Sequence, residues 1–202
     1  MMTTTLVSAP AAVADGITKT YGAGDAAIRA VDGVTLEIPG GRMTAIMGPS
    51  GSGKSTLMHC MAGLDTVTSG RVLIGDHDLG AMSERDLTAL RRDHVGFVFQ
   101  AYNLVPTLTA AGNITLPFDL AGRRGDPVWF RHVVDAVGLA DRLDHRPSEL
   151  SGGQQQRVAV ARALVTQPEI VFADEPTGNL DSRAGAALLT FLRDATRSLG
   201  QT

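Results

Sequence analysis

The sequence lacks the features expected of a membrane-spanning, disulfide-bonded or nucleic-acid-binding chain. Its 202 residues include a single cysteine, Cys60, so no disulfide can form within the chain. No run approaches the roughly 18 apolar residues that span a bilayer, so any work at a membrane would need a partner. The formal net charge of −3 argues against non-specific binding of nucleic acid as the main role, and no nucleic-acid partner is expected.

The remaining composition is that of a globular protein with one domain, or with a core domain and a subdomain. Hydrophobic residues make up 44% of the chain and charged residues 19%. The N-terminus is small and apolar, and residues 12–14 faintly resemble a signal-peptidase site. It has no basic start, however, and Ser8 and Pro10 interrupt the apolar stretch. We therefore expect residues 1–12 to form a disordered tail.

Alternating strand and helix patterns predict an α/β fold. Apolar runs predict strands at 13–21, 31–38, 43–47, 71–74, 95–99 and 170–173, and helices are expected at 54–62 and 83–93. Ser83 and Asp86 favour the start of the second helix. Between 101 and 150 no strand run occurs, which indicates an inserted helical subdomain. The helical spacing there involves Phe130, Val133, Val134 and Val137; Ala184, Leu188, Phe191 and Ala195 line one face of a last helix.

Residues 48–56 fit the phosphate-binding pattern G-x-x-x-x-G-K-[ST] and follow the apolar run 43–47. Glycines let the backbone wrap around a polyphosphate, and the helix that follows adds the positive end of its dipole. Lys54 would reach the β- and γ-phosphates, and the Ser55 hydroxyl would bind Mg²⁺. The alternative is a flexible Gly/Ser-rich loop. The predicted nucleotide-binding residues here are Gly48, Pro49, Ser50, Gly51, Ser52, Gly53, Lys54, Ser55 and Thr56.

Two further motifs point to the same chemistry. Asp174 ends an apolar strand, where its carboxylate can meet Mg²⁺, and Glu175 is placed to act as general base toward an attacking water. The alternative is a solvated acidic pair before a turn. Ser151 begins a helix that is expected to reach about Val165, which creates a second anion-binding helix start. The alternative there is a plain serine-capped helix.

Together, the phosphate loop, residues 150–157 and residues 170–176 resemble the ATP-binding cassette (ABC) ATPases, over essentially all of residues 13–202. The resemblance implies ATP and Mg²⁺ as cofactors. It also implies an α/β P-loop core with a mostly parallel sheet, an N-terminal antiparallel β element and a helical subdomain. The core would comprise 13–100 and 157–202, and the subdomain 101–156. Two such domains would pair head to tail, so that one copy's signature caps the partner's ATP. The capping residues are Ser151, Gly152, Gly153 and Gln154.

The resemblance also implies roles for three single residues. Tyr21 would stack on adenine, although it could also be a core tyrosine at a strand end. Gln100 would touch Mg²⁺ and sense the γ-phosphate, unless it is a surface glutamine. Asp181 would lie in the loop that crosses the dimer interface, and it could also cap the last helix. Catalysis is thus expected of Glu175, Lys54 and Gln100, and Mg²⁺ binding of Ser55, Gln100 and Asp174.

Residues 97–109 and 173–181 resemble one branch of the family, which comprises the lipoprotein-releasing, macrolide-efflux and antimicrobial-peptide exporters and the cell-division ATPase. This implies an ATPase at the cytoplasmic face of a membrane, attached through a permease. Tyr102, Leu104, Val105 and Leu108 would form the apolar groove that receives the permease, unless they are local core. A regulatory ATPase that moves no solute remains an alternative. The soluble ABC proteins of translation or DNA repair usually carry two cassettes or a long coiled coil, and neither is present here.

The sequence departs from the family at its end. The family places a histidine after one further strand beyond the acidic pair, whereas all five histidines here precede Asp174. That strand would lie between the phosphate-loop strand and the strand that ends at Asp174, and its loss would leave buried backbone groups unpaired. We therefore expect a fragment of a longer protein or a truncated gene product, which binds ATP weakly and does not hydrolyse it normally. A nucleotide-binding remnant without turnover is an alternative function.

Overall fold

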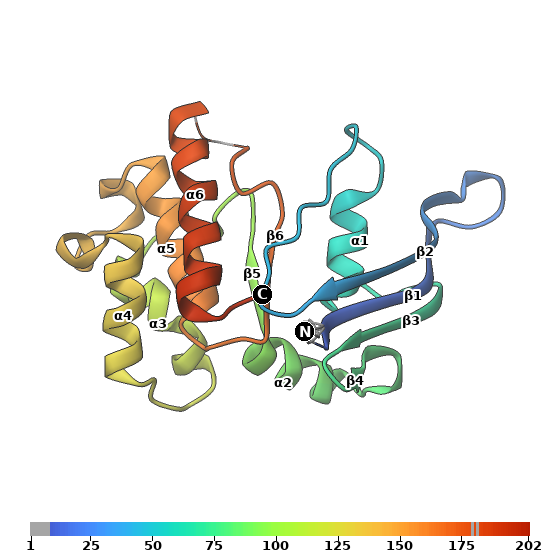
Figure 1. The fold of residues 1–202 in the computed structure, drawn as a ribbon, viewed down its shortest axis with the longest axis horizontal. Helices are drawn as coiled ribbons and strands as arrows, with labels where there is room; N and C mark the ends of the chain where they lie inside the picture. The colour runs from blue at the N-terminus through green and yellow to red at the C-terminus, as the bar shows by residue number, and fades with distance from the viewer. Residues whose placement is uncertain (1–8, 179, 181) are drawn as a thin grey trace, which may run out of the picture. The chain divides into compact units, whose positions relative to one another are not determined.

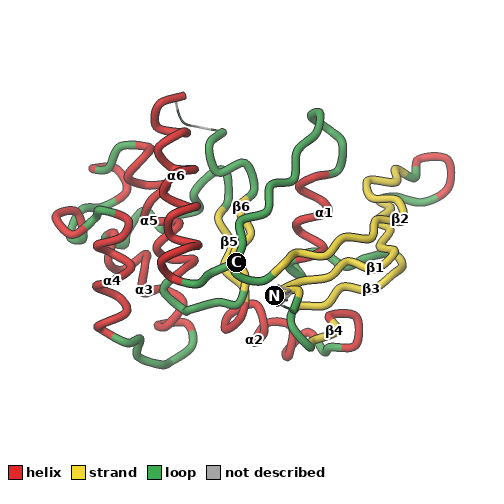
Figure 2. The backbone as a smooth tube through the Cα atoms, viewed as in Figure 1, coloured by secondary structure: helices red, strands yellow, loops and turns green. Residues whose placement is uncertain are grey.

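The structure is a computed structural model that describes residues 9–178, 180 and 182–202 (Figures 1 and 2). The chain forms two compact units. The first comprises residues 9–87 and Thr202, and the second is Thr88–Gln201. The boundary falls inside helix α2 (Glu84–His94), whose start is capped by the Ser83 hydroxyl, as predicted: this oxygen accepts a hydrogen bond from the Asp86 N–H at 3.2 Å.

The first unit is built on an antiparallel sheet with the strand order β2-β1-β3-β4. Its long central strand β1 pairs with β2 on one side and with β3 on the other. A register shift between Ala14 and Ile17 includes Gly16 at φ 58°, and it keeps Ala12, Ala14 and Ile17 all on the buried face. The strand bounds are β1 Pro10–Tyr21, β2 Ile28–Pro39, β3 Ser69–Ile74 and β4 His77–Asp78.

Helix α1 (Lys54–Met61) packs against β1, β2 and β3 and buries Cys60 and Met61. Two short 3₁₀ helices complete the unit, Gly24–Ala26 in the turn between β1 and β2, and Leu79–Ala81 after β4. The predicted turn at residues 22–25 is confirmed, since Gly22 and Gly24 both have positive φ there.

The second unit has helix α5 (Gly152–Leu164) at its centre. This helix packs against β5 (Val95–Val98), α3 (Ala110–Leu120), α4 (Pro127–Val137) and α6 (Ser182–Leu199). Strand β5 pairs in parallel with β6 (Ile170–Ala173), and the two run side by side in Figure 1. Gly96 lets β5 approach α5 closely, because a Cβ there would lie 2.6 Å from the Ala163 carbonyl oxygen. Short 3₁₀ helices span Ala140–Arg142 and Pro147–Glu149.

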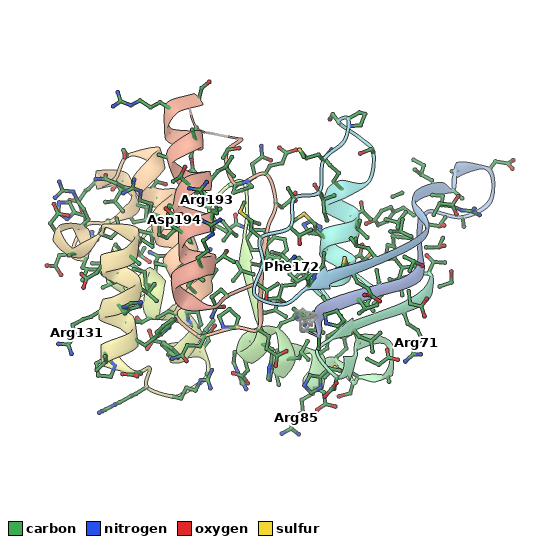
Figure 3. The ribbon with its side chains drawn as sticks, viewed as in Figure 1. Arg71, Arg85, Arg131, Phe172, Arg193 and Asp194 are labelled. Carbon is green, nitrogen blue, oxygen red and sulfur yellow. The ribbon has the colours of Figure 1, made fainter. Side chains whose placement is uncertain are left out.

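The helix faces of this unit follow the predicted periodicity. Val133, Val134 and Val137 of α4 and Leu188 of α6 are buried in one apolar cluster, and Phe130 and Phe191 pack against it partly exposed. Charged side chains occupy the other faces: Figure 3 shows Arg131 projecting from α4, and Arg193 and Asp194 on α6. Phe172 of β6, also labelled there, stacks against Phe97 of β5 with 6.4 Å between ring centroids.

Several predicted boundaries and two elements require correction. Strands β2 and β3 begin at Ile28 and Ser69, rather than at residues 31 and 71. Strand β1 begins at Pro10, so residues 10–12 belong to it rather than to the tail, because they pair with β2 and β3. The predicted tail residues 1–8 lie outside the described residues. The two-residue strand β4 and helix α3 had no individual prediction. Helix α3 contains Gly112 and Pro117, which are poor helix formers, so its sequence does not indicate a helix. The Thr109 hydroxyl nevertheless caps it by accepting the Gly112 N–H. The expectation of no strand within 101–150, all described, is confirmed.

The predicted strand at residues 43–47 is wrong. These residues have no regular secondary structure, and the side chains of Met43 and Met47 are 45% and 88% exposed. An apolar run shows strand propensity, but a strand forms only where a neighbour pairs with its backbone. That neighbour is supplied by tertiary structure and cannot be read from the run itself.

Within the part of the chain that the structure describes, no helix combines the length and apolar character needed to cross a bilayer.

Candidate nucleotide-binding and catalytic site

The phosphate loop lies in the first unit, directly before α1. Gly53 occupies the N-cap of this helix with φ 87°, a left-handed conformation that favours glycine. A Cβ on Gly53 would also overlap the carbonyl oxygen of Ala30 in β2. Gly51 is left-handed as well, at φ 76°. The sequence therefore folds here into a turn whose backbone lies open, as a close approach by a phosphate requires.

Lys54 closes this loop with its own side chain. Its ammonium donates hydrogen bonds to the carbonyl oxygens of Gly48 at 3.0 Å and Pro49 at 2.6 Å. The ammonium and the first amides of α1 thus carry positive charge at one place, which suits a polyanion. Ser55 follows in the first turn of the helix and is half-buried. These features fit the triphosphate of ATP, and the Ser55 hydroxyl is a suitable oxygen ligand for Mg²⁺.

Tyr21 ends strand β1 in the same unit. The residue is 43% exposed, which excludes the alternative of a core tyrosine. The hydroxyl donates a hydrogen bond to Asp65 Oδ2 at 2.7 Å, and this bond raises the pKa of Tyr21, as does burial. A hydrogen bond with Thr56, in the first turn of α1, acts on that pKa in the opposite direction. The structure therefore brings Tyr21 to the helix that begins at the phosphate loop.

The second unit brings two predicted groups together at one edge of the parallel pair. Val98 lies opposite Ala173, so β5 and β6 end side by side, and the Asp174 N–H donates to the Val98 carbonyl at 3.0 Å. Gln100 therefore emerges beside the loop that begins at Asp174. The Gln100 side chain lies against Gly178, because a Cβ added to this glycine would be 2.7 Å from Gln100 Nε2. The carboxyl edge of a parallel sheet is where α/β proteins commonly place their ligands.

Glu175 has an unusual backbone conformation within this loop. Its φ is 44°, in the left-handed region that non-glycine residues rarely adopt, and its side chain is exposed. The Gly178 N–H donates to the Glu175 carbonyl at 2.9 Å, which closes the turn. Strained residues of this kind cluster at functional sites. The arrangement points the next residues away from the strand and presents the Glu175 carboxylate to solvent, where a general base can act on water.

Ser151 caps helix α5 in a capping box. Its hydroxyl accepts the Gln154 N–H at 3.3 Å, and Gln154 Oε1 accepts the Ser151 N–H at 2.9 Å. The serine-capped helix left open as an alternative is therefore formed. An anion role is compatible with it, because Ser151 and Gly152 are exposed and a Cβ on Gly153 would meet nothing within 4 Å.

The segment after Gln100 is held by two side chains that sequence reasoning missed. Arg162 of α5 donates to the carbonyl oxygens of Tyr102 at 2.8 Å and Asn103 at 2.6 Å, and burial lowers the pKa of Arg162. Tyr102 and Asn103, whose carbonyls Arg162 contacts, both have positive φ. Asn113 of α3, fully buried, bonds the backbone of Val105 through both amide atoms. No local signal identified either side chain, because each acts on residues that precede it in another element.

The predicted groove residues take an intermediate position. Tyr102, Leu104, Val105 and Leu108 are all half-buried, and Tyr102 and Leu104 pack against the core cluster of the unit. The groove and the local-core alternatives thus both remain open. Asn179 and Asp181 lie outside the described residues.

Comparison with known proteins identifies the family. The family described as ABC transporter matches residues 31–178, which is more than half of the chain. The chain belongs to the ABC transporter family. Its ABC fold is also that of a solved ATP-binding cassette, MJ0796, in a dimeric post-hydrolysis state bound to ADP and Pi. The TM-score is 0.83 at 40% identity, covering 95% of this chain and 85% of that one. The predicted α/β P-loop fold class with an N-terminal antiparallel β element is therefore confirmed. The sheet is not mostly parallel among the described residues, however, because only β5 and β6 pair in parallel and β1 to β4 are antiparallel.

Curated ABC relatives include proteins of two sizes. The chain is 48% identical over 190 residues to the macrolide export ATP-binding/permease protein MacB of Brucella melitensis. That match covers 93% of this chain but 29% of MacB, so the chain spans less than a third of this relative's length. It is 47% identical over 182 residues to an uncharacterized ABC transporter ATP-binding protein of Thermotoga maritima, covering 87% of this chain and 76% of that protein.

Proposed function

We propose that this ABC chain binds ATP with Mg²⁺ and hydrolyses it to power an exporter in a membrane. The observation that carries the proposal is the phosphate loop, where Gly53 leaves no room for a side chain and Lys54 supplies a fixed ammonium. The membership of the family and the likeness to an ADP- and Pi-bound cassette support it. The nucleotide-binding residues of this loop are residues 48–56, with Tyr21 as the platform for the base.

The hydrolytic step is assigned to the loop at the carboxyl edge of β5 and β6. Glu175 takes a proton from water as that water attacks the γ-phosphorus, while the bond from phosphorus to the β–γ bridging oxygen breaks and ADP leaves. The side-chain oxygens of Asp174 and Gln100 would hold Mg²⁺. Lys54 stabilises the charge that develops on the transferred phosphoryl oxygens. Mg²⁺ supplies charge neutralisation when bound. The Ser55 hydroxyl is the ligand to Mg²⁺ that the phosphate loop contributes.

The signature segment is proposed to act on a second copy of the chain. Ser151, Gly152, Gly153 and Gln154 open α5, where the amides of Gly152 and Gly153 and the helix dipole suit an anion. The first unit already supplies a phosphate cradle, so this second anion-binding tip is best used on the partner's ATP. The dimeric state of the MJ0796 cassette supports such a pair.

The membrane partner is proposed to be a permease of the macrolide-export type, with this chain at its cytoplasmic face. MacB joins an ATP-binding part and a permease in one protein, as its name states. The half-buried residues Tyr102, Leu104, Val105 and Leu108 are proposed as the docking groove. Arg162 and Asn113 hold this segment in one conformation, which a docking surface needs.

The proposed function is tested by binding and turnover in two variants. In Lys54→Ala, the affinity for MgATP in titration calorimetry should fall about tenfold or more, because a charge-assisted contact with the phosphates is lost. In Glu175→Gln, affinity should be unchanged, while phosphate release should fall at least about 100-fold, because general-base catalysis is lost. The exposed carboxylate Asp76→Ala serves as a control that changes neither.

Normal affinity in Lys54→Ala together with normal turnover in Glu175→Gln would show that the site is wrongly assigned.

A further inference from the structure

Three side chains of the first unit form a compact cluster, and one of them is Tyr21, the proposed platform for the base. Lys19 and Tyr21 are two residues apart on β1 and therefore point to the same face of the sheet. Asp65, just beyond the end of α1, binds both: its Oδ1 lies 2.6 Å from Lys19 Nζ, and its Oδ2 accepts the Tyr21 hydroxyl at 2.7 Å. We call these three residues the Asp65 clamp.

The backbone around Asp65 completes the coordination of the clamp. The Thr66 N–H donates to Asp65 Oδ1 at 2.8 Å, and the Thr66 carbonyl accepts from the Lys19 ammonium at 2.7 Å. Lys19 is 8% exposed, so its charge is largely removed from water and depends on these partners. Each oxygen of Asp65 thus has a different role: Oδ1 neutralises Lys19, and Oδ2 fixes the Tyr21 hydroxyl.

The ionisation of the clamp supports this geometry. The hydrogen bond with Asp65 raises the pKa of Lys19 above its ordinary value, against the effect of burial. Burial alone would raise the pKa of Asp65, but the hydrogen bonds from Lys19 and Tyr21 outweigh it and leave this pKa lowered. The ion pair is therefore fully charged at neutral pH.

The clamp determines how the Tyr21 ring is presented. The hydroxyl bond holds the outer end of the side chain, so the ring cannot turn freely about its first torsion. The Lys19 ammonium lies 4.8 Å from the ring centroid, over one face of the ring. A flat heterocycle can therefore stack only on the opposite face. A ring held in one orientation before binding loses less entropy when a base stacks on it.

We propose that Asp65 is a positioning residue for the nucleobase, acting through Tyr21 and Lys19 rather than by touching the nucleotide. The inference rests on the proposed function, because it assumes that a nucleotide occupies the phosphate loop and stacks its base on Tyr21. It predicts that Asp65 strengthens the binding of the base and leaves the binding of the phosphates unchanged.

The test compares ATP with inorganic tripolyphosphate, each with Mg²⁺, in titration calorimetry on the whole chain. Tripolyphosphate engages the phosphate loop but has no base. Tyr21→Ala should weaken ATP binding about tenfold, because base stacking is lost. Asp65→Ala should weaken it about threefold to tenfold, because the ring is no longer held. Neither substitution should change the affinity for tripolyphosphate.

Two further variants distinguish a loss of ring positioning from a general folding defect. Tyr21→Phe removes the hydroxyl bond while keeping the ring and the Lys19–Asp65 pair, and it should weaken ATP alone by about threefold. In a Tyr21→Phe background, adding Asp65→Ala should cost less than it does in the parent, because the two residues share one bond. Asp76→Ala, an exposed carboxylate in the same unit, is the matched control and should change neither ligand.

The outcomes separate the two levels of the proposal. Equal losses of ATP and tripolyphosphate affinity in Asp65→Ala would overturn the positioning role, because Asp65 would then support only the fold of the unit. The positioning role would also be overturned if Asp65→Ala bound ATP with normal affinity while Tyr21→Ala bound it more weakly. If the parent binds neither ligand, the phosphate-loop function itself is wrong, and the inference falls with it.

Discussion

At the scale of single residues, glycine positions show where the backbone needs a left-handed conformation or has no room for a side chain. Gly53 and Gly51 both have positive φ, but only Gly53 also faces another backbone, the Ala30 carbonyl of β2. Gly51 and Gly53 are thus constrained for different reasons. Gly51 needs only its conformational freedom, whereas Gly53 also needs the absence of a Cβ.

This difference gives a paired prediction. Gly51→Ala introduces strain alone and should reduce the free energy of unfolding by about 1 kcal/mol. Gly53→Ala adds a backbone overlap and should cost about 3 kcal/mol, with loss of MgATP binding as the loop is displaced. Urea unfolding and titration calorimetry measure the two effects. Equal destabilisation by both substitutions would contradict the close approach of Ala30.

At the scale of elements, Asn113 shows how one helix organises the loop that precedes it. The side chain is completely buried at the start of α3. Its Oδ1 accepts the Val105 N–H at 2.7 Å, and its Nδ2 donates to the carbonyls of Val105, Leu108 and Thr109 at 3.0–3.3 Å. The backbone of the proposed docking segment from Val105 to Thr109 is therefore held by the amide of a residue in α3.

We predict that Asn113→Leu, which keeps the size of the side chain, lowers the free energy of unfolding by about 3 kcal/mol, because the Val105 N–H and its neighbouring carbonyls lose their buried partner. Amide hydrogen exchange should accelerate at residues 105–109 in particular. Asp119→Ala, at the exposed end of the same helix, is the control and should lie within about 0.5 kcal/mol of the parent. An Asn113→Leu variant as stable as this control would disprove the role.

At the scale of the whole molecule, the predicted site residues are divided between two units. The first holds Tyr21 and residues 48–56, and the second holds Gln100, Ser151–Gln154, Asp174 and Glu175. The helix tip at Ser151 is capped within its own chain, yet the space in front of Gly153 is open. A helix tip of this kind, proposed to bind an anion, is available to a second copy.

Pairing of two chains can be tested at this tip. In a Glu175→Gln background with MgATP, the chain should elute as a dimer in size-exclusion chromatography with light scattering. Adding Gly153→Asp should keep it monomeric while ATP still binds, because the new carboxylate fits sterically but repels the partner's phosphates. Ala136→Asp, an exposed site on α4, adds the same charge elsewhere and should leave the dimer intact. A dimer that persists in Gly153→Asp would exclude Ser151–Gln154 from the interface.

Residues whose roles depend on neighbours in sequence were predictable, and those that act across the fold were not. The face of α4, the cap at Ser83 and the elements β5 and β6 follow from local periodicity and capping. Asp65 lies 44 residues from Tyr21, and Arg162 lies 60 residues from Tyr102. No pattern over such separations marks which carboxylate meets which hydroxyl. The strand expected at residues 43–47 failed for the same reason, since pairing is not a local property.

The sequence by itself determined the family, the phosphate loop, the acidic pair and the signature helix, because each depends on residue types at fixed short spacings. Tertiary structure alone decided that Gln100 lies against Gly178, that Asn113 holds Val105, and that Asp65 joins Lys19 to Tyr21. These contacts depend on how strands and helices pack, which places side chains within hydrogen-bonding distance irrespective of their separation along the chain.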